Sequence, residues 1–556
     1  MKHTIQEIQE AVEVCGGIRA AGRELGIPES TIRLRLKKHM AELLSSTADS
    51  GEFVFTSYRA PRPQVFEPMA DHVRYFILTS AQDSSKVHED FWNCLHVYAD
   101  WLENCEIIVS GFTYAKKLFE DHDTRSPRVG FHPLVDPYIT HERVRIGDEL
   151  DFCGEMNTLP TAVTPLSGFS TYTRARWGVF PHPKVQLESI ATMKHERAKQ
   201  LMTTGAVTLP NYIRKKAGIK GMFHHMVGAV LVELAPDGST YCRHLLATDL
   251  DDGSFYDLDR FVTRDGVTEG HRVEAISYGD IHHEKLDPTV ALATWGYDVD
   301  EGVRWDRSNW DGMYVDEDHD LGPLPLIHSL RPHYEFYHDL SDFAPRNHHN
   351  IKDHHFRFER HTAGKRSDSV QVALAGCAHF LNEVQRDDCL SIVVESNHDQ
   401  ALLKWLKTAD YRDDPENAVF FLSCQLWYYK QLAAGVGSPD IFQQVMRVYG
   451  CPDDVIFVNE DESFVICGDI ECGMHGHLGP NGSRGSPLAI SRAGMKSNTG
   501  HTHSPAIRDG AYVGGVSGSL DMGYNRGPSS WAHAHIVTYP NGRRTILTLH
   551  NGRFYA

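Results

Sequence analysis

Short apolar runs separated by polar loops predict that this chain is built from both strands and helices. RYFILTSAQ (74–82) and CEIIVSGFTY (105–114) have the composition of strands, and residues 88–104 between them have the spacing of an amphipathic helix. A strand, a helix and a second strand in this order form a βαβ-like unit. Three further strands are expected at 186–192, 228–234 and 241–250.

The end of the chain alternates between polar and apolar residues around two Asn-Gly pairs, Asn541–Gly542 and Asn551–Gly552. Asn-Gly favours the tight turn that joins two antiparallel strands. The pattern therefore predicts a C-terminal antiparallel sheet with hairpins.

The first 45 residues carry a helical pattern that is interrupted by a turn. Ala20, Ala21 and Leu25 lie on one helical face, and Gly26–Ile27–Pro28 supplies the turn before a second helix. This resembles a helix-turn-helix unit of the factor-for-inversion or pipsqueak type, whose second helix enters the major groove of DNA. The resemblance implies DNA contacts by Thr31, Arg33, Arg35, Lys37 and Lys38. The alternative is a helical hairpin used for oligomerisation or docking.

Composition divides the chain into four regions. Residues 46–70 are polar, small and proline-rich, which is typical of a linker. They separate the helix-turn-helix-like unit, 1–45, from an α/β domain at 71–270 that shows no catalytic constellation. The last region, 271–556, holds the candidate chemistry and the C-terminal hairpins.

Charge and composition narrow the possible functions. The net charge of −19 argues against a general nucleic-acid coat, so contact with a polyanion needs local basic patches or metals. The eleven cysteines show no CxxC pair and fit reduced thiols in a cytoplasm. We expect no membrane span and no signal peptide, because no apolar run is long enough. The 34 histidines agree with metal chemistry.

Five short motifs of acids, amides and histidines follow one another in the second half, each after an apolar, strand-like run. They read GDIHH (Asp280, His282), HDLSD (Asp339, Asp342), SNHD (Asn397, His398), MHGH (His475) and GHTH (His501, His503). Side chains at strand ends of an α/β sheet line a cleft. Oxygen and imidazole ligands together favour Mn, Fe or Zn over Ca or Mg. Seven such ligands suffice for two metals that share a carboxylate.

This order of motifs resembles the calcineurin-like metallophosphoesterase superfamily, whose signature is DxH, GDxxD, GNH[DE], an HG dipeptide and GHxH. The resemblance covers residues 274–515 and implies a two-sheet β-sandwich flanked by helices. With the α/β middle domain and the N-terminal helix-turn-helix, the expected class is α/β. The resemblance implies that Asp280, His282 and His503 bind one metal, that Asp339 bridges both, and that Asn397, His475 and His501 complete the second site.

The same resemblance implies a mechanism. A hydroxide between two divalent metals would attack phosphorus, and His398 would protonate the leaving oxygen as general acid. Asp342 would accept a hydrogen bond from the His398 ring and keep it protonated. The sequence departs from the family pattern at His338 and Ser396, where glycine is usual.

Two features favour DNA as the substrate: the helix-turn-helix candidate, and a basic segment at 346–366 that reads either as an exposed helix or as a phosphate contact. The superfamily includes the double-strand-break repair nuclease, which implies manganese as the working ion, with Mg, Fe or Zn as alternatives. The whole arrangement also resembles the pre-early DNA-transfer proteins of certain lytic tailed phages. That implies a DNase that degrades host DNA in the cytoplasm of an infected bacterium. We also expect the protein to form a homo-oligomer.

Two other function classes remain open at this point. One is a phosphatase or cyclic-nucleotide phosphodiesterase whose N-terminal unit only docks or oligomerises. The other is a DNA-binding regulator with a structural metal site.

Overall fold

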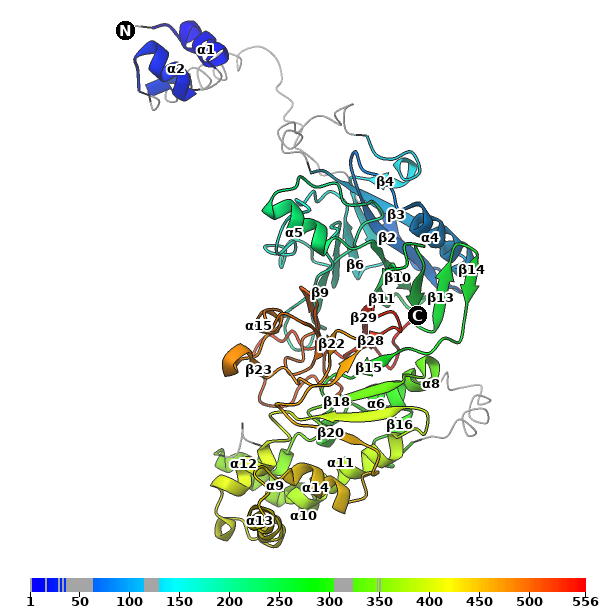
Figure 1. Ribbon diagram of the computed structural model, residues 1–556, viewed down its shortest axis with the longest axis vertical. Coiled ribbons are helices and arrows are strands. Elements are labelled where there is room, and N and C mark those ends of the chain that lie inside the picture. The colour runs from blue at the N-terminus through cyan, green and yellow to red at the C-terminus, as the bar shows by residue number, and fades with distance from the viewer. Residues whose placement is uncertain are drawn as a thin grey trace. The chain divides into compact units, whose positions relative to one another are not determined.

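The computed structural model describes residues 3–15, 18–28, 31–32, 35–36, 64–114, 130–304, 324–347, 349 and 352–556. The chain forms two compact units, Met1–Arg62 and Pro63–Ala556 (Figure 1). The large unit is mixed α/β, in agreement with the predicted class.

The described part of the small unit is helical. Helices α1 (Ile5–Val14) and α2 (Ile18–Leu25) pack through Ile8 and Ala21. The chain turns after α2 at Gly26, whose φ of +63° is favourable only for glycine and a few polar residues.

The predicted second helix of this unit is described in part. Residues 31–32 and 35–36 are helical, and Thr31 and Arg35 are half-buried. Three of the predicted DNA contacts, Arg33, Lys37 and Lys38, lie outside the described residues.

The predicted strand–helix–strand unit is confirmed in the large unit. Strands β2 (Arg74–Gln82) and β3 (Cys105–Phe112) are parallel neighbours, and α4 (Glu89–Leu102) connects them. The apolar face of α4 packs on this sheet through side chains such as Phe91 and Leu95. The sheet runs β11–β10–β2–β3–β4 and also contains β4 (Ile139–Thr140), β10 (Gly228–Leu234) and β11 (Thr240–Leu246).

The largest sheet has 11 strands and joins the middle of the chain to its C-terminal part. In spatial order it contains β1 (Gln64–Phe66), β5 (Arg143–Ile146), β6 (Leu150–Cys153), β7 (Trp177–Phe180), β9 (Lys199–Thr203), β8 (Leu187–Ile190), β26 (Ala506–Arg508), β27 (Ala511–Val513), β25 (Lys496–Thr499), β22 (Ile470–Glu471) and β21 (Val465–Ile466). Its two halves meet where Leu187 of β8 pairs with Ile507 of β26. The regions 71–270 and 271–556 therefore share one sheet.

A six-stranded sheet carries the first three motifs. Its order is β20 (Ile456–Val458), β19 (Leu390–Val394), β18 (Tyr334–His338), β15 (Ala275–Ser277), β28 (Ala534–Thr538) and β29 (Arg544–Thr548). The first four strands are parallel, and β28 and β29 form the hairpin predicted at Asn541–Gly542. Asn551–Gly552 forms a turn closed by a single bridge between His550 and Arg553, without a further strand.

The six-stranded sheet is buried on both faces. Because successive side chains of a strand point to opposite faces, Ile276 packs against helices while its neighbour Ala275 packs against Ile470 of the 11-stranded sheet. The helical side is formed by α6 (Pro288–Trp295), α8 (Leu326–Leu330), α11 (Val370–Val384), α12 (Ala401–Thr408), α13 (Ala418–Ala433) and α14 (Ile441–Val448).

Smaller elements complete the described part of the large unit. They are β12 (Phe255–Asp257), β13 (Arg260–Thr263), β14 (Gly266–Thr268), β16 (Tyr297–Asp298), β17 (Val303–Arg304), β23 (Leu478–Gly479), β24 (Ser483–Arg484), α5 (Lys216–His224), α9 (His354–Thr362), α10 (Lys365–Asp368), α15 (Pro487–Ile490) and several short 3₁₀ turns. All eleven cysteines are free thiols. Among the described helices, none has the length and apolar composition needed to cross a membrane.

Candidate metal centre

The five motifs lie beyond the carboxyl ends of strands in two sheets that pack on each other. Asp280 follows β15, Asp339 follows β18 and Asn397 follows β19 in the six-stranded sheet. His475 follows β22 and His501 follows β25 in the 11-stranded sheet. Because β15, β18 and β19 are parallel neighbours, as are β22 and β25, the carboxyl ends within each set meet at one edge. The topology thus gathers segments that are distant in sequence.

Four buried side chains form the core of the centre: Asp280, His282, Asp339 and His503. One donor atom of each lies within 4.8 Å of the corresponding atoms of the other three. His503 Nε2 is 3.0 Å from Asp280 Oδ2 and 3.0 Å from His282 Nε2. His282 Nε2 is in turn 3.6 Å from Asp339 Oδ2. Two carboxylates and two imidazoles at this spacing suit a transition metal.

The other three predicted ligands adjoin this core. His475 Nε2 is 3.3 Å from Asp339 Oδ2, and its Nδ1 is 4.0 Å from Asp280 Oδ1. His501 Nδ1 is 3.1 Å from Asn397 Oδ1, and the His501 backbone amide donates to Asp280 Oδ2 at 2.8 Å. The Asp339 carboxylate therefore contacts imidazoles of both predicted metal sites.

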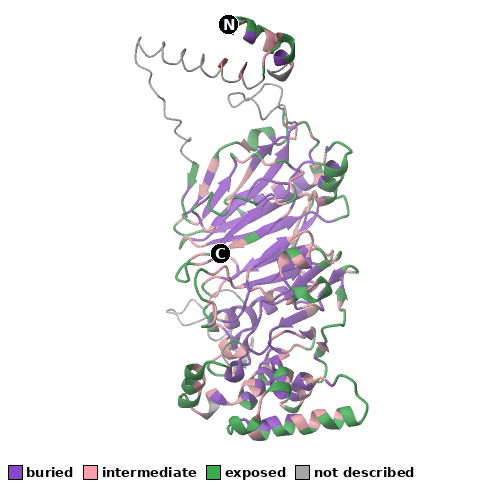
Figure 2. Ribbon diagram, turned by 90° about the vertical axis from the view of Figure 1, so that its left-hand side faces the viewer, coloured by how far each residue is buried: buried purple, intermediate pink, exposed green. Residues whose placement is uncertain are grey.

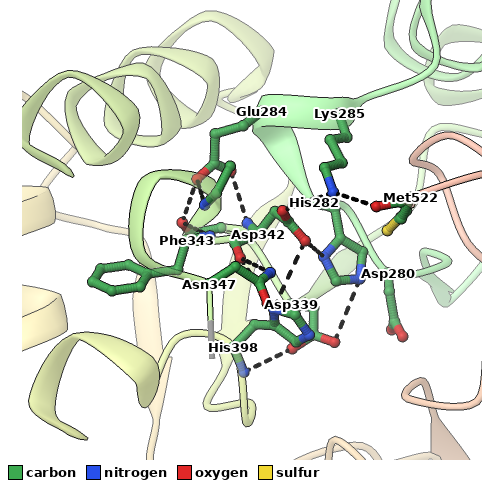
Figure 3. A network of polar contacts seen from close by, with 12 residues as sticks. Asp280, His282, Glu284, Lys285, Asp339, Asp342, Phe343, Asn347, His398 and Met522 are labelled. Atoms are coloured by element: carbon green, nitrogen blue, oxygen red, sulfur yellow. Dashed lines mark hydrogen bonds and ion pairs between the residues drawn. The ribbon is translucent and has the colours of Figure 1, made fainter. Parts of the chain in front are cut away.

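His398 and Asp342 lie beside the core, but they contact each other differently from the expectation. His398 Nδ1 donates to the backbone carbonyl of Asp342 at 3.2 Å, whereas the nearest carboxylate oxygen is 3.9 Å away. The Asp342 carboxylate instead lies 3.3 Å from His282 Nδ1 and 3.2 Å from Lys285 Nζ (Figure 3). Asp342 thus orients His398 through its main chain and His282 through its side chain.

The backbone at the centre adopts conformations that are unfavourable for most residues. His282, Asp339, His501 and His503 have φ values of +47°, +44°, +77° and +56°. Residues held in this left-handed region cost about 1–3 kcal/mol each and are found mainly where function fixes them. Gly500 permits a close approach, because a Cβ at that position would collide with Asp280 Oδ1.

Charge balance keeps the carboxylates ionised despite their burial. Burial by itself would raise the pKa of Asp339, but the neighbouring His475 and His398 outweigh it and hold that pKa well below its usual range. Asp280 shows the same balance, with His475 and His503 lowering its pKa. Burial also opposes ionisation of Asp342, yet His282 and Lys285 lower its pKa to about 2.

The histidines of the centre divide into two classes. Burial lowers the pKa of His282 and lowers that of His501 to about 4, so both rings are neutral at pH 7 and suited to bind metal. Burial acts in the same direction on His475, but Asp339 and Asp280 outweigh it and raise its pKa to about 9. Among these three imidazoles, His475 is therefore the one whose pKa favours the protonated form at neutral pH.

The centre has the properties expected of a divalent-metal site. Asp280 Oδ1, both ring nitrogens of His475 and Nδ1 of His503 are buried, and none of them forms a hydrogen bond with a described residue. Buried polar groups without hydrogen bonds are costly unless an ion or a water satisfies them. The donor set of carboxylates, imidazoles and one amide suits Mn, Fe or Zn.

Several neighbours of the centre were not predicted from the sequence. Glu284 accepts hydrogen bonds from the backbone amides of Asp342 and Ala344 and so holds the loop that carries Asp342. Lys285, in the same segment, donates to the carbonyl of Met522. Because Glu284 and Lys285 directly follow the GDIHH motif, their position in the sequence could have identified them as neighbours of the centre.

Two aromatic residues of the 514–533 segment also border the centre. The ring centroids of Trp531 and His503 are 4.2 Å apart. The ring of Tyr524 is stacked on that of His349, with 4.6 Å between the two centroids. This segment has no motif of its own, so these contacts could not be predicted from sequence patterns.

The basic segment at 346–366 has two parts. Arg346 is buried and forms ion pairs with Asp368 and Asp414, both at 2.6 Å, so it stabilises the fold. The exposed helix α9 forms the middle of the segment, as one of the two sequence interpretations expected, and Arg357 on it donates to the carbonyl of Asp413.

Comparison with known proteins identifies a relative. No protein-family model matches the chain, and no solved structure matches it. The chain is 38% identical over 490 residues to Protein A1 of Escherichia phage T5, an alignment that covers 86% of this chain and 83% of that protein. With this identity over most of both sequences, the chain belongs to the family of phage T5 protein A1.

Proposed function

We propose that this protein is a metal-dependent phosphodiesterase that cleaves DNA, with manganese as the working ion. The observation that carries the proposal is the buried group of Asp280, His282, Asp339 and His503, with His398 beside it. As part of the same proposal, we assign the mixed α/β fold more narrowly to the metallophosphoesterase type, a two-sheet β-sandwich flanked by helices. Two β-sheets that pack on each other, with helices on the far face of one, support it.

Seven side chains would hold two divalent ions, with Asp339 between them. They are Asp280, His282 and His503 for one ion and Asn397, His475 and His501 for the other. When bound, such ions polarise a phosphoryl oxygen and lower the pKa of water. Burial of these side chains strengthens the electrostatic interactions among them.

His398 is the residue proposed to donate a proton to the leaving oxygen. A carbonyl can only accept a hydrogen bond, so the ring nitrogen that faces the Asp342 carbonyl, Nδ1, carries a proton. Nε2 is therefore the atom proposed to exchange a proton with substrate. The backbone amide of His398 also donates to Asp339 Oδ1 at 3.2 Å, which fixes the ring relative to the metal ligands.

DNA is the substrate class we propose, and the site of action is the cytoplasm of an infected host. Two observations support it: the similarity to a protein of a phage, and the separate helical unit at the N-terminus. A phosphatase, a cyclic-nucleotide phosphodiesterase or a DNA-binding regulator with a structural metal would share the metal centre, so the substrate must be tested directly.

The decisive experiment is incubation of the purified protein with linear and circular DNA in the presence of Mn, Mg, Zn or a chelator. We expect cleavage with Mn and none with the chelator. Hydrolysis of a small chromogenic diester without cleavage of DNA would favour the phosphodiesterase alternative. Metal binding and DNA binding without hydrolysis of either substrate would favour the regulator.

A further inference from the structure

Helix α13 (Ala418–Ala433) is apolar on both of its faces. Its inner face packs Phe420, Phe421 and Cys424 into the main core of the large unit. Its sequence, AVFFLSCQLWYYKQLA, contains a single charged residue, Lys430, although 23% of the whole chain is charged. A helix that is apolar all round is normally buried all round.

The outer face of α13 nevertheless lies in solvent. Val419, Leu422, Leu426 and Tyr429 have exposed fractions of 79%, 46%, 58% and 64%. In Figure 2, α13 is the lowest helix of the large unit and shows exposed residues along its length. Large side chains in such a contiguous row mark an interaction surface.

The spacing of these residues indicates what covers them. Positions 419, 422, 426, 429 and 433 follow one another at intervals of three, four, three and four residues. This is the a/d pattern of a seam between two α-helices, where each side chain inserts between residues of a facing helix. The seam is about 21 Å long, from a rise of 1.5 Å per residue. The surface therefore fits a helix with the same spacing.

A second copy of the chain supplies such a helix. In a two-fold symmetric pair the same surface is used on both sides, so a patch must be complementary to itself. The α13 seam meets this condition, because it is apolar throughout and carries its one charge, Lys430, at its edge. Each copy has a net charge of −19, whereas α13 itself contains no acidic residue, so two copies that meet along this helix bring no carboxylates of α13 together.

We propose that two copies of this protein associate through α13, with Leu426 at the centre of the contact. Tyr429 and Leu426 fill the middle of the seam, where apolar and aromatic side chains contribute most to association. None of the proposed metal ligands lies on α13, so this proposal does not rest on the proposed activity.

The test compares one substitution in the seam with a matched one outside it. Sedimentation velocity of the full chain should give twice the chain mass of 62.7 kDa for the wild type. Leu426→Glu should sediment as a single chain, with a dissociation constant raised by about 100-fold or more, because it places a carboxylate in an apolar seam. Ile219→Glu on α5 is the control, since Ile219 is 57% exposed and lies outside the seam.

Cross-linking locates the contact independently of stability. Leu426→Cys lies at the centre of the seam, so a short bifunctional thiol reagent should join two copies whichever direction the helices run. Ile219→Cys and the wild type report cross-links through other cysteines. A monomeric wild type, or an Leu426→Glu variant that stays associated, would overturn the proposal. Circular dichroism must show that Leu426→Glu remains folded.

Discussion

The metal centre and the outer face of α13 break the usual distribution of side chains in opposite ways. At the centre, carboxylates and imidazoles are buried, and several of their polar atoms form no hydrogen bond with a described residue. On α13, large apolar side chains are exposed along about three turns of helix. Either arrangement costs free energy in an isolated chain. We infer that each region is complete only with a partner, a cation in one case and an apolar surface in the other.

The largest effect is expected from a change at the carboxylate that contacts both parts of the metal centre. Asp339→Asn keeps the shape of the side chain and removes its charge, so we expect Mn-dependent cleavage of DNA to fall by at least about 1,000-fold. Mn binding, measured by calorimetry, should weaken in parallel. Asp469→Asn, at an exposed carboxylate paired with Lys496, is the control and should retain both properties. Normal turnover by Asp339→Asn would remove the centre from the mechanism.

A smaller and more selective loss is expected at His398. His398→Gln should lower turnover on DNA by about 100-fold, because DNA has a poor leaving group that needs a proton. A nitrophenyl diester, whose leaving group departs without protonation, should lose much less. Metal content should stay unchanged, since His398 is not a proposed ligand. An equal loss on both substrates would contradict the acid role.

The raised pKa of His475 predicts that the affinity of the centre for metal depends on pH. Because this pKa is about 9, metal must displace a proton from His475 at neutral pH, so affinity should rise with pH. From the titration of His475 alone, we expect the affinity for metal to rise about tenfold per pH unit between pH 6 and pH 8.5. Calorimetry in buffers of different ionisation enthalpy should detect one released proton. Affinity that falls or stays constant over this range would show that His475 is not a ligand.

The smallest effect is expected from removing the N-terminal helical unit, which contains neither the metal centre nor α13. Deleting residues 1–45 should weaken DNA binding by about tenfold and reduce its salt dependence, because cationic side chains are lost. Hydrolysis of a small diester should not change, since the metal centre lies wholly in the other compact unit. Retention of full DNA affinity would leave only the docking or oligomerisation alternative for this unit.

Local sequence patterns predicted those parts of the fold whose contacts are local. The β2–α4–β3 unit and the hairpin at Asn541–Gly542 follow from hydrophobic spacing and turn chemistry over short stretches. The boundary placed at residue 271 does not separate two sheets, because β8 and β26 pair across more than 300 residues. A pairing at that separation leaves no periodic signal in either strand.

The sequence predicted which side chains gather at the candidate centre, but not what surrounds them. Motif spacing named seven candidate ligands, and the structure places them close together, beside His398 and Asp342. The partner of each ring depends on side-chain rotation, so the contact of the Asp342 carboxylate with His282 could not be read from spacing. Tyr524 and Trp531 reach the centre from a loop whose path is set by the fold around it.

The pairing of β8 with β26 has a practical consequence for work with fragments. A polypeptide beginning near residue 271 would contain every proposed ligand, yet β26 would lose its neighbour and expose an unsatisfied strand edge. Such edges recruit other chains, so we expect the truncated product to precipitate. A fragment that keeps the candidate metal centre folded should therefore begin at Pro63, where the compact unit begins.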